Sequence, residues 1–130
     1  LIVVTNQSGV GRQYYTADDY KTLMAWMCAE LRTKGITIDG YYECYCHEDA
    51  EDEHYRRGSY YRKPNPGMIS QAANEFDIDL SRSIMIGDKK SDMLAAKAAG
   101  VPKRIWITDK EADETLGTAV PNLAAVQKLI

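Results

Sequence analysis

The chain has 130 residues, of which 45% are hydrophobic and 27% charged, with a net charge of −3. This is the composition of one globular domain, residues 1–130, with no basic surface for nucleic acid or an anionic membrane. No apolar run reaches the roughly 20 residues of a membrane-spanning helix, and three cysteines, an odd number, do not form a disulfide framework. We expect a cytoplasmic protein with reduced cysteines.

The first quarter of the chain predicts a strand, a polar loop and a helix. Residues 1–4 (LIVV) form an apolar run without an initiating Met, which predicts an interior strand in a piece of a longer chain. Residues 5–12 fit either an anion-binding loop or a plain turn. Thr16 with Asp19 predicts a helix start, Tyr20 to Leu31 has core-facing periodicity, and Gly35 ends the helix.

The middle of the chain changes from apolar to strongly charged. Residues 40–46 predict a tyrosine-rich second strand, and residues 47–61 predict a long exposed loop. Asn65 and Pro66 predict the N-cap and first residue of a helix. Two cations, Arg62 and Lys63, precede this helix start. They either point into a binding site or form a solvated pair on the surface.

The stretch at residues 84–92 (IMIGDKKSD) connects an apolar strand to a helix through one glycine. Residues 83–86 predict a buried strand, and residues 93–99 a helix that ends at Gly100. Asp88 and Asp92 then fall at the carboxyl end of the strand. Residues 104–108 predict another strand, 109–117 a loop, and Asn122 the cap of a short helix.

Alternating strands and helices predict an α/β fold with a parallel sheet. Residues 5–7, 62–63 and 88–92 each fall at or near the carboxyl end of a strand, so we expect them to converge at one edge. Hydroxyl and amide groups, a lysine and paired carboxylates suit an anionic substrate and a divalent cation. The pattern is typical of phosphoryl transfer.

Three stretches carry a family resemblance: residues 3–9 (VVTNQSG), 62–68 (RKPNPGM) and 86–93 (IGDKKSDM). They resemble motifs II, III and IV of the haloacid dehalogenase-like (HAD) phosphatases, in the branch of D,D-heptose 1,7-bisphosphate and histidinol phosphatases. The resemblance implies a three-layer Rossmann-like core, here without its N-terminal strand. It implies phosphoryl binding by Thr5 and Asn6, charge neutralisation by Lys63, Mg²⁺ ligation by Asp88, bracing of the metal site by Asp92, and substrate contacts from Arg62 and Lys89.

The implied activity is Mg²⁺-dependent hydrolysis of a small sugar phosphate, the 7-phosphate of D-glycero-D-manno-heptose 1,7-bisphosphate, in lipopolysaccharide precursor synthesis, by a monomer. Histidinol phosphate or another small ester is the alternative substrate, and a non-catalytic binding module the alternative class. The family's nucleophile and general acid lie in a D-x-D-G-T motif that these 130 residues do not contain. The sequence is then either a truncated piece of a longer phosphatase, which we favour, or a degenerate relative, and in both cases we expect these 130 residues to be inactive by themselves.

Many members of this branch hold a structural zinc through a Cys-x-His pair and a later Cys-x-Cys pair. Here Cys44 and Cys46 occupy the place of the first pair, and residues 59–61 (SYY) stand at the second. Two thiolates do not complete a tetrahedral site, although His47 and His54 could supply the missing ligands. We expect no structural zinc and a more mobile loop 47–61.

Overall fold

The computed structural model describes residues 1–56, 58–110 and 112–130. These residues form two compact units, Leu1–Arg62 and Lys63–Ile130. Each unit is an α/β arrangement with a parallel sheet, which confirms the predicted class. No helix in the described ranges is both long and apolar enough to cross a membrane.

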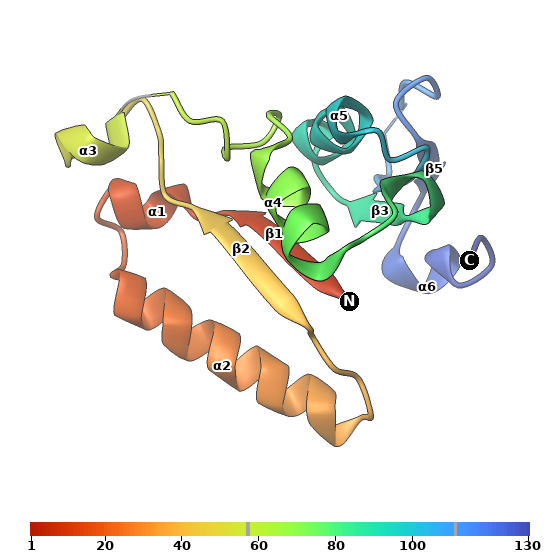
Figure 1. Cartoon of the computed structure of the whole chain (residues 1–130), viewed down its shortest axis with the longest axis horizontal. Helices are drawn as coiled ribbons and strands as arrows, with labels where there is room; N and C mark the ends of the chain where they lie inside the picture. Colours follow the sequence, from red (N-terminus) through yellow and green to blue (C-terminus); the bar gives the residue numbers. More distant parts are fainter. Residues whose placement is uncertain (57, 111) are drawn as a thin grey trace. The chain divides into compact units, whose positions relative to one another are not determined.

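The first unit contains two parallel strands, β1 (Ile2–Asn6) and β2 (Gly40–Cys44), paired from Ile2 with Gly40 to Asn6 with Cys44. Between them lie a single helical turn, α1 (Ser8–Gly11), and the long helix α2 (Ala17–Thr33), as Figure 1 shows. A short helix, α3 (Glu53–Arg56), follows β2. The loop predicted at residues 5–12 is therefore partly helical.

Helix α2 begins at the predicted capping box. Thr16 Oγ1 accepts a hydrogen bond from Asp19 N at 3.0 Å, and Asp19 Oδ2 accepts one from Thr16 N at 2.8 Å. These bonds hold the pKa of Asp19 below its usual value, because they favour the charged carboxylate. Gly35, with φ of +76°, follows the helix end.

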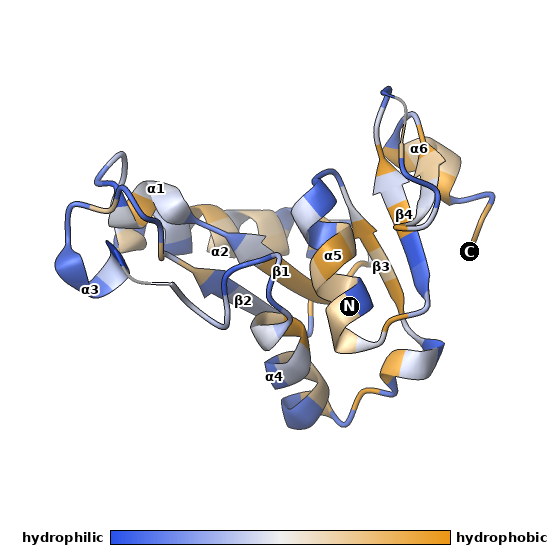
Figure 2. Cartoon of the chain, turned by 90° about the horizontal axis from the view of Figure 1, so that it is seen from above, coloured by the Kyte–Doolittle hydropathy of each residue, from blue (hydrophilic) through white to orange (hydrophobic). Residues whose placement is uncertain are grey.

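The buried face of α2 is narrower than its apolar periodicity indicates. Tyr20 and Met24 are buried, but Leu23 is 57% exposed and Trp26 is 61% exposed. The prediction that Leu23 faces the core is wrong for the described chain; Met27 and Leu31, on the same predicted face, are half-buried. Figure 2 shows the resulting mixture of hydrophobic and hydrophilic residues along α2.

The second unit contains three parallel strands in the order β3 (Ile84–Gly87), β4 (Lys103–Ile107) and β5 (Thr118–Val120). Helix α5 (Lys90–Ala99) packs on β3 and β4 and against α4 (Gly67–Phe76), and α6 (Leu123–Val126) packs on β5. A short 3₁₀ turn, Leu80–Arg82, precedes β3. The strand β5 was not predicted, because it has only three residues within a polar tail.

The core of the second unit forms where α5 covers the sheet. Met93, Ala95 and Ala96 of α5 are fully buried, as is Ile105 of β4 at 1% exposure. The α5 stop at Gly100 and the Asn122 cap of α6 are confirmed, with Asn122 Oδ1 accepting from Ala125 N at 3.0 Å. Small alanines let α5 lie close to the strands.

Two details of this unit differ from the sequence prediction. Helix α4 has Pro66 and not Asn65 as its N-cap, because the Pro66 carbonyl already accepts the first helical hydrogen bond, from Ser70 N at 2.9 Å. In β3, Ile84 is 41% exposed and Ile86 is 38% exposed. The strand is apolar but not buried in the described residues, since it lies at the edge of its sheet.

Candidate active site

The junction between β3 and α5 packs a glycine against an aspartate. A Cβ atom at Gly87 would lie 2.5 Å from Asp92 Oδ2, so only glycine lets the strand end this close to the helix. Asp92 is the third residue of α5, and its Oδ2 accepts a hydrogen bond from the Lys89 backbone N–H at 3.0 Å. This bond fixes the start of α5 directly after the strand.

A buried ion pair joins this junction to the chain before α4. Lys63 Nζ lies 2.5 Å from Asp92 Oδ1, and the exposed fractions of the two side chains are 9% and 5%. The contact is an ion pair by distance and not an aligned hydrogen bond. Because both oxygens of Asp92 face protein groups, Asp92 is suited to hold its neighbours in place and not to ligate a metal directly.

The side chain of Asp88, unlike that of Asp92, is exposed to solvent. Its side chain is 70% exposed, and its Oδ2 lies 3.9 Å from Lys89 Nζ. The backbone is fixed by Trp106, whose Nε1–H donates to the Asp88 carbonyl at 3.2 Å. Trp106 pairs in register with Gly87 on the neighbouring strand, a relation that the sequence alone did not reveal. The result is an accessible carboxylate on a positioned backbone.

The residues at this junction fit a magnesium ion in part. Mg²⁺ prefers oxygen ligands and is usually held by one or two carboxylates, with waters and substrate phosphate completing six positions. Asp88 offers one such carboxylate. The described residues contain no group of three or more His, Cys, Asp or Glu side chains that could hold a metal by themselves.

The carboxyl end of β1 presents hydroxyl and amide groups. Thr5 and Asn6 are its last two residues, and both are half-buried. Gln7 Nε2 donates to Thr5 Oγ1 at 3.0 Å, and the Tyr15 hydroxyl donates to Gln7 Oε1 at 2.7 Å. Gln7 lies within the motif at residues 3–9, but the motif predicts no role for it, and no local sequence pattern pointed to Tyr15.

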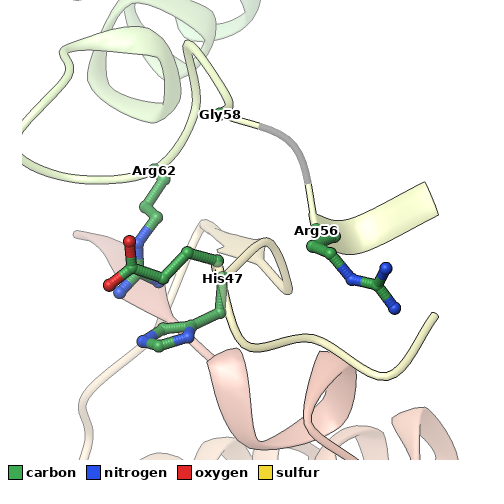
Figure 3. Close-up of a pocket in the computed structure, with 5 residues that line it drawn as sticks. His47, Arg56, Gly58 and Arg62 are labelled. Atoms are coloured by element: carbon green, nitrogen blue, oxygen red, sulfur yellow. The ribbon is translucent and has the colours of Figure 1, made fainter. Parts of the chain in front are cut away.

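Arg62 lines a cavity of about 400 Å³ with His47, Glu48, Arg56 and Gly58. Its guanidinium donates to the Cys46 carbonyl at 2.8 Å, which ties the end of the first unit to the segment that follows β2. Figure 3 shows the side chains of Arg62 and His47 close together and that of Arg56 directed away from them. The Arg56 guanidinium binds the carbonyls of Ala50 and Glu51, each at 3.0 Å.

The segment predicted as a long exposed loop is partly folded. Tyr55 of α3 packs edge-on against Tyr45, with ring centroids 5.7 Å apart, and Tyr45 packs edge-on against Tyr20 at 6.2 Å. Ala50 is 2% exposed. Burial and the charge of Glu43 raise the pKa of Tyr45 to about 12. Aromatic packing, which local sequence does not reveal, therefore organises this segment.

The two cysteines considered for zinc lie at the start of this segment. Cys44 is buried at the end of β2, and Cys46 is half-buried; neither forms a disulfide. His47 Nδ1 accepts a hydrogen bond from Asp49 N at 3.1 Å, and His54 stacks against Tyr55. Both histidines thus have other contacts. The absence of zinc remains a prediction.

The predicted site residues divide between the two units. The first unit holds Thr5, Asn6 and Arg62, and the second holds Lys63, Asp88, Lys89 and Asp92. The model of the HAD-hydrolase-like family matches residues 60–128, more than half of the chain. The chain belongs to this family.

Two curated relatives of this HAD-like chain are named as heptose bisphosphate phosphatases. The D-glycero-alpha-D-manno-heptose-1,7-bisphosphate 7-phosphatase of Burkholderia mallei (strain ATCC 23344) is 45% identical over 118 residues, 91% of this chain and 62% of the relative. The D-glycero-beta-D-manno-heptose-1,7-bisphosphate 7-phosphatase of Photorhabdus laumondii subsp. laumondii is 36% identical over 135 residues, 100% of this chain and 72% of the relative. The chain thus spans roughly two thirds of their lengths.

A solved structure supports the fold. The D,D-heptose 1.7-bisphosphate phosphatase from B. bronchiseptica, complexed with magnesium and phosphate, superposes with a TM-score of 0.79 at 26% identity. The match covers 98% of this chain and 72% of that one. The HAD-like α/β fold expected from the three motifs is therefore confirmed.

Proposed function

We propose that this HAD-like chain binds the phosphate and the magnesium of a Mg²⁺-dependent phosphatase that hydrolyses the 7-phosphate of D-glycero-D-manno-heptose 1,7-bisphosphate. The proposal rests on the different exposure of two aspartates after β3. Asp88 is exposed, whereas Asp92 is buried in an ion pair with Lys63. The names of the relatives support the substrate. The proposal includes the monomeric, cytoplasmic protein expected from the sequence.

Each group of residues has a separate task in this proposal. Thr5 and Asn6 would donate hydrogen bonds to phosphoryl oxygens, and Arg62 would bind the remainder of the anionic substrate. Lys63, held by Asp92, would offset negative charge on the transferring group, with Lys89 as a second, exposed cation. When bound through Asp88, Mg²⁺ supplies positive charge to the phosphoryl oxygens.

The proposal does not assign the nucleophile to these residues. The 130 residues contain no D-x-D-G-T sequence, and the proposal uses the exposed Asp88 carboxylate as an oxygen ligand for Mg²⁺. Activity assays must therefore use the complete product of the gene.

The substitution Asp88→Asn tests the metal assignment. It should abolish Mg²⁺-dependent phosphate release from the heptose bisphosphate and leave the unfolding midpoint unchanged, because the side chain is 70% exposed. Asp18→Asn, which removes an equal charge from an exposed position in α2, is the matched control and should retain activity. Full activity of Asp88→Asn would reject the assignment.

A further inference from the structure

We infer that Tyr15 is a positioning residue, which acts through Gln7 to keep the Thr5 hydroxyl proton directed toward the phosphoryl group. The inference rests on the proposed function and adds residues to it. Its basis is the hydrogen-bonded chain from Tyr15 through Gln7 to Thr5 in the first unit.

The direction of each hydrogen bond follows from chemistry and distance. The Tyr15 hydroxyl and Gln7 Oε1 are 2.7 Å apart, the usual separation for O–H···O, while Gln7 Nε2 and Thr5 Oγ1 are 3.0 Å apart, as in N–H···O. A phenol donates more readily than it accepts, because its oxygen lone pair is delocalised into the ring. Tyr15 therefore favours the amide orientation that presents the carbonyl to the phenol and the NH₂ group to Thr5.

The orientation of Gln7 decides what Thr5 can do. A hydroxyl has one proton and two lone pairs, so a threonine that accepts from Gln7 keeps its proton for another partner. At the carboxyl end of β1 that partner would be an anionic phosphoryl oxygen. In the reversed amide orientation Gln7 would accept from Thr5, and this donor would be lost.

The backbone holds Tyr15 where it can reach Gln7. Tyr14 N donates to the Gly9 carbonyl at 2.8 Å, which folds the chain back over α1. A Cβ atom at Gly9 would lie 2.2 Å from Tyr15 Cε1, so the ring occupies the space that a larger residue would need. Gly9 therefore permits the hydrogen bond from Tyr15 to Gln7.

Tyr15→Phe removes only the hydroxyl group and tests this inference in the complete gene product. We expect kcat for the heptose bisphosphate to fall by about three- to tenfold, the effect of one hydrogen bond, with little change in KM or in the unfolding midpoint. Tyr14→Phe is the matched control, since the Tyr14 hydroxyl contacts Arg12 and not Gln7. It should retain wild-type kcat.

A double-substitution cycle separates positioning from a merely structural effect. In a Thr5→Val background, Tyr15→Phe should cause no further loss of kcat, because the hydroxyl on which it acts is already absent. Equal kcat values for the two Phe variants, or multiplicative losses with Thr5→Val, would overturn the inference while the wild-type activity still supports the proposed function. An inactive wild-type protein would overturn both.

Discussion

The buried ion pair of Lys63 with Asp92 gives the sharpest stability prediction. Asp92→Asn keeps an oxygen that can accept from Lys89 N but removes the charge that lies 2.5 Å from Lys63 Nζ. The Lys63 side chain is only 9% exposed, so solvent replaces the lost partner poorly. Removing one member of a buried pair costs about 3–5 kcal/mol. Because the hydrogen bond from Lys89 N is retained, we expect the free energy of unfolding to fall by about 3 kcal/mol, the lower end of this range.

Urea unfolding followed by circular dichroism measures this loss. The control is Asp88→Asn, the same change four residues earlier on a side chain that is 70% exposed, with an expected effect within about 0.5 kcal/mol. Replacing both partners, as Lys63→Met with Asp92→Asn, should recover most of the stability, since the Lys63 charge is removed with that of Asp92 and the acceptor for Lys89 N is kept. Equal unfolding midpoints for Asp92→Asn and Asp88→Asn would refute the assignment of a buried, stabilising pair.

Two further predictions concern the tyrosines of the first unit. Tyr20→Phe should raise the free energy of unfolding by about 1 kcal/mol in urea titrations, because the buried Tyr20 hydroxyl has no hydrogen-bond partner in the described part of the chain; a clear loss would contradict this. Burial and the charge of Glu43 raise the pKa of Tyr45 to about 12 in the folded chain, against 10 in the unfolded chain. The contribution of this shift to the free energy of unfolding is therefore complete below about pH 10 and is lost as the pH rises toward 12. Tyr45→Phe should therefore lose less stability than the wild type between pH 9 and pH 11.5, and parallel pH profiles would exclude this cause.

Local signals in the sequence predicted the elements that carry the site. The capping box of Thr16 and Asp19 placed the start of α2, and the glycine between an apolar strand and paired carboxylates placed the junction of β3 and α5. These signals work because the interactions involved span only a few residues. The exposure of Asp88 and the burial of Asp92, four residues apart, come from contacts that such signals do not contain.

The contacts that the sequence did not reveal join distant positions. Lys63 meets Asp92, Trp106 meets the Asp88 carbonyl, and Tyr45 stacks on Tyr55. Strand register and side-chain packing decide each of them. The segment after β2 illustrates the point: most of its described residues are exposed, as predicted, but its sequence did not predict the short helix α3 or the packing of Tyr55 on Tyr45.

Phosphate release by the complete gene product decides whether the protein is a heptose bisphosphate phosphatase. D-glycero-D-manno-heptose 1,7-bisphosphate and histidinol phosphate are compared at equal concentration, with Mg²⁺ and with EDTA. We expect Mg²⁺-dependent release of one phosphate from the heptose bisphosphate, leaving heptose 1-phosphate. Its kcat/KM should be at least about tenfold above that for histidinol phosphate, a difference of about 1.4 kcal/mol in transition-state binding. No Mg²⁺-dependent release, or a preference for histidinol phosphate, would contradict it.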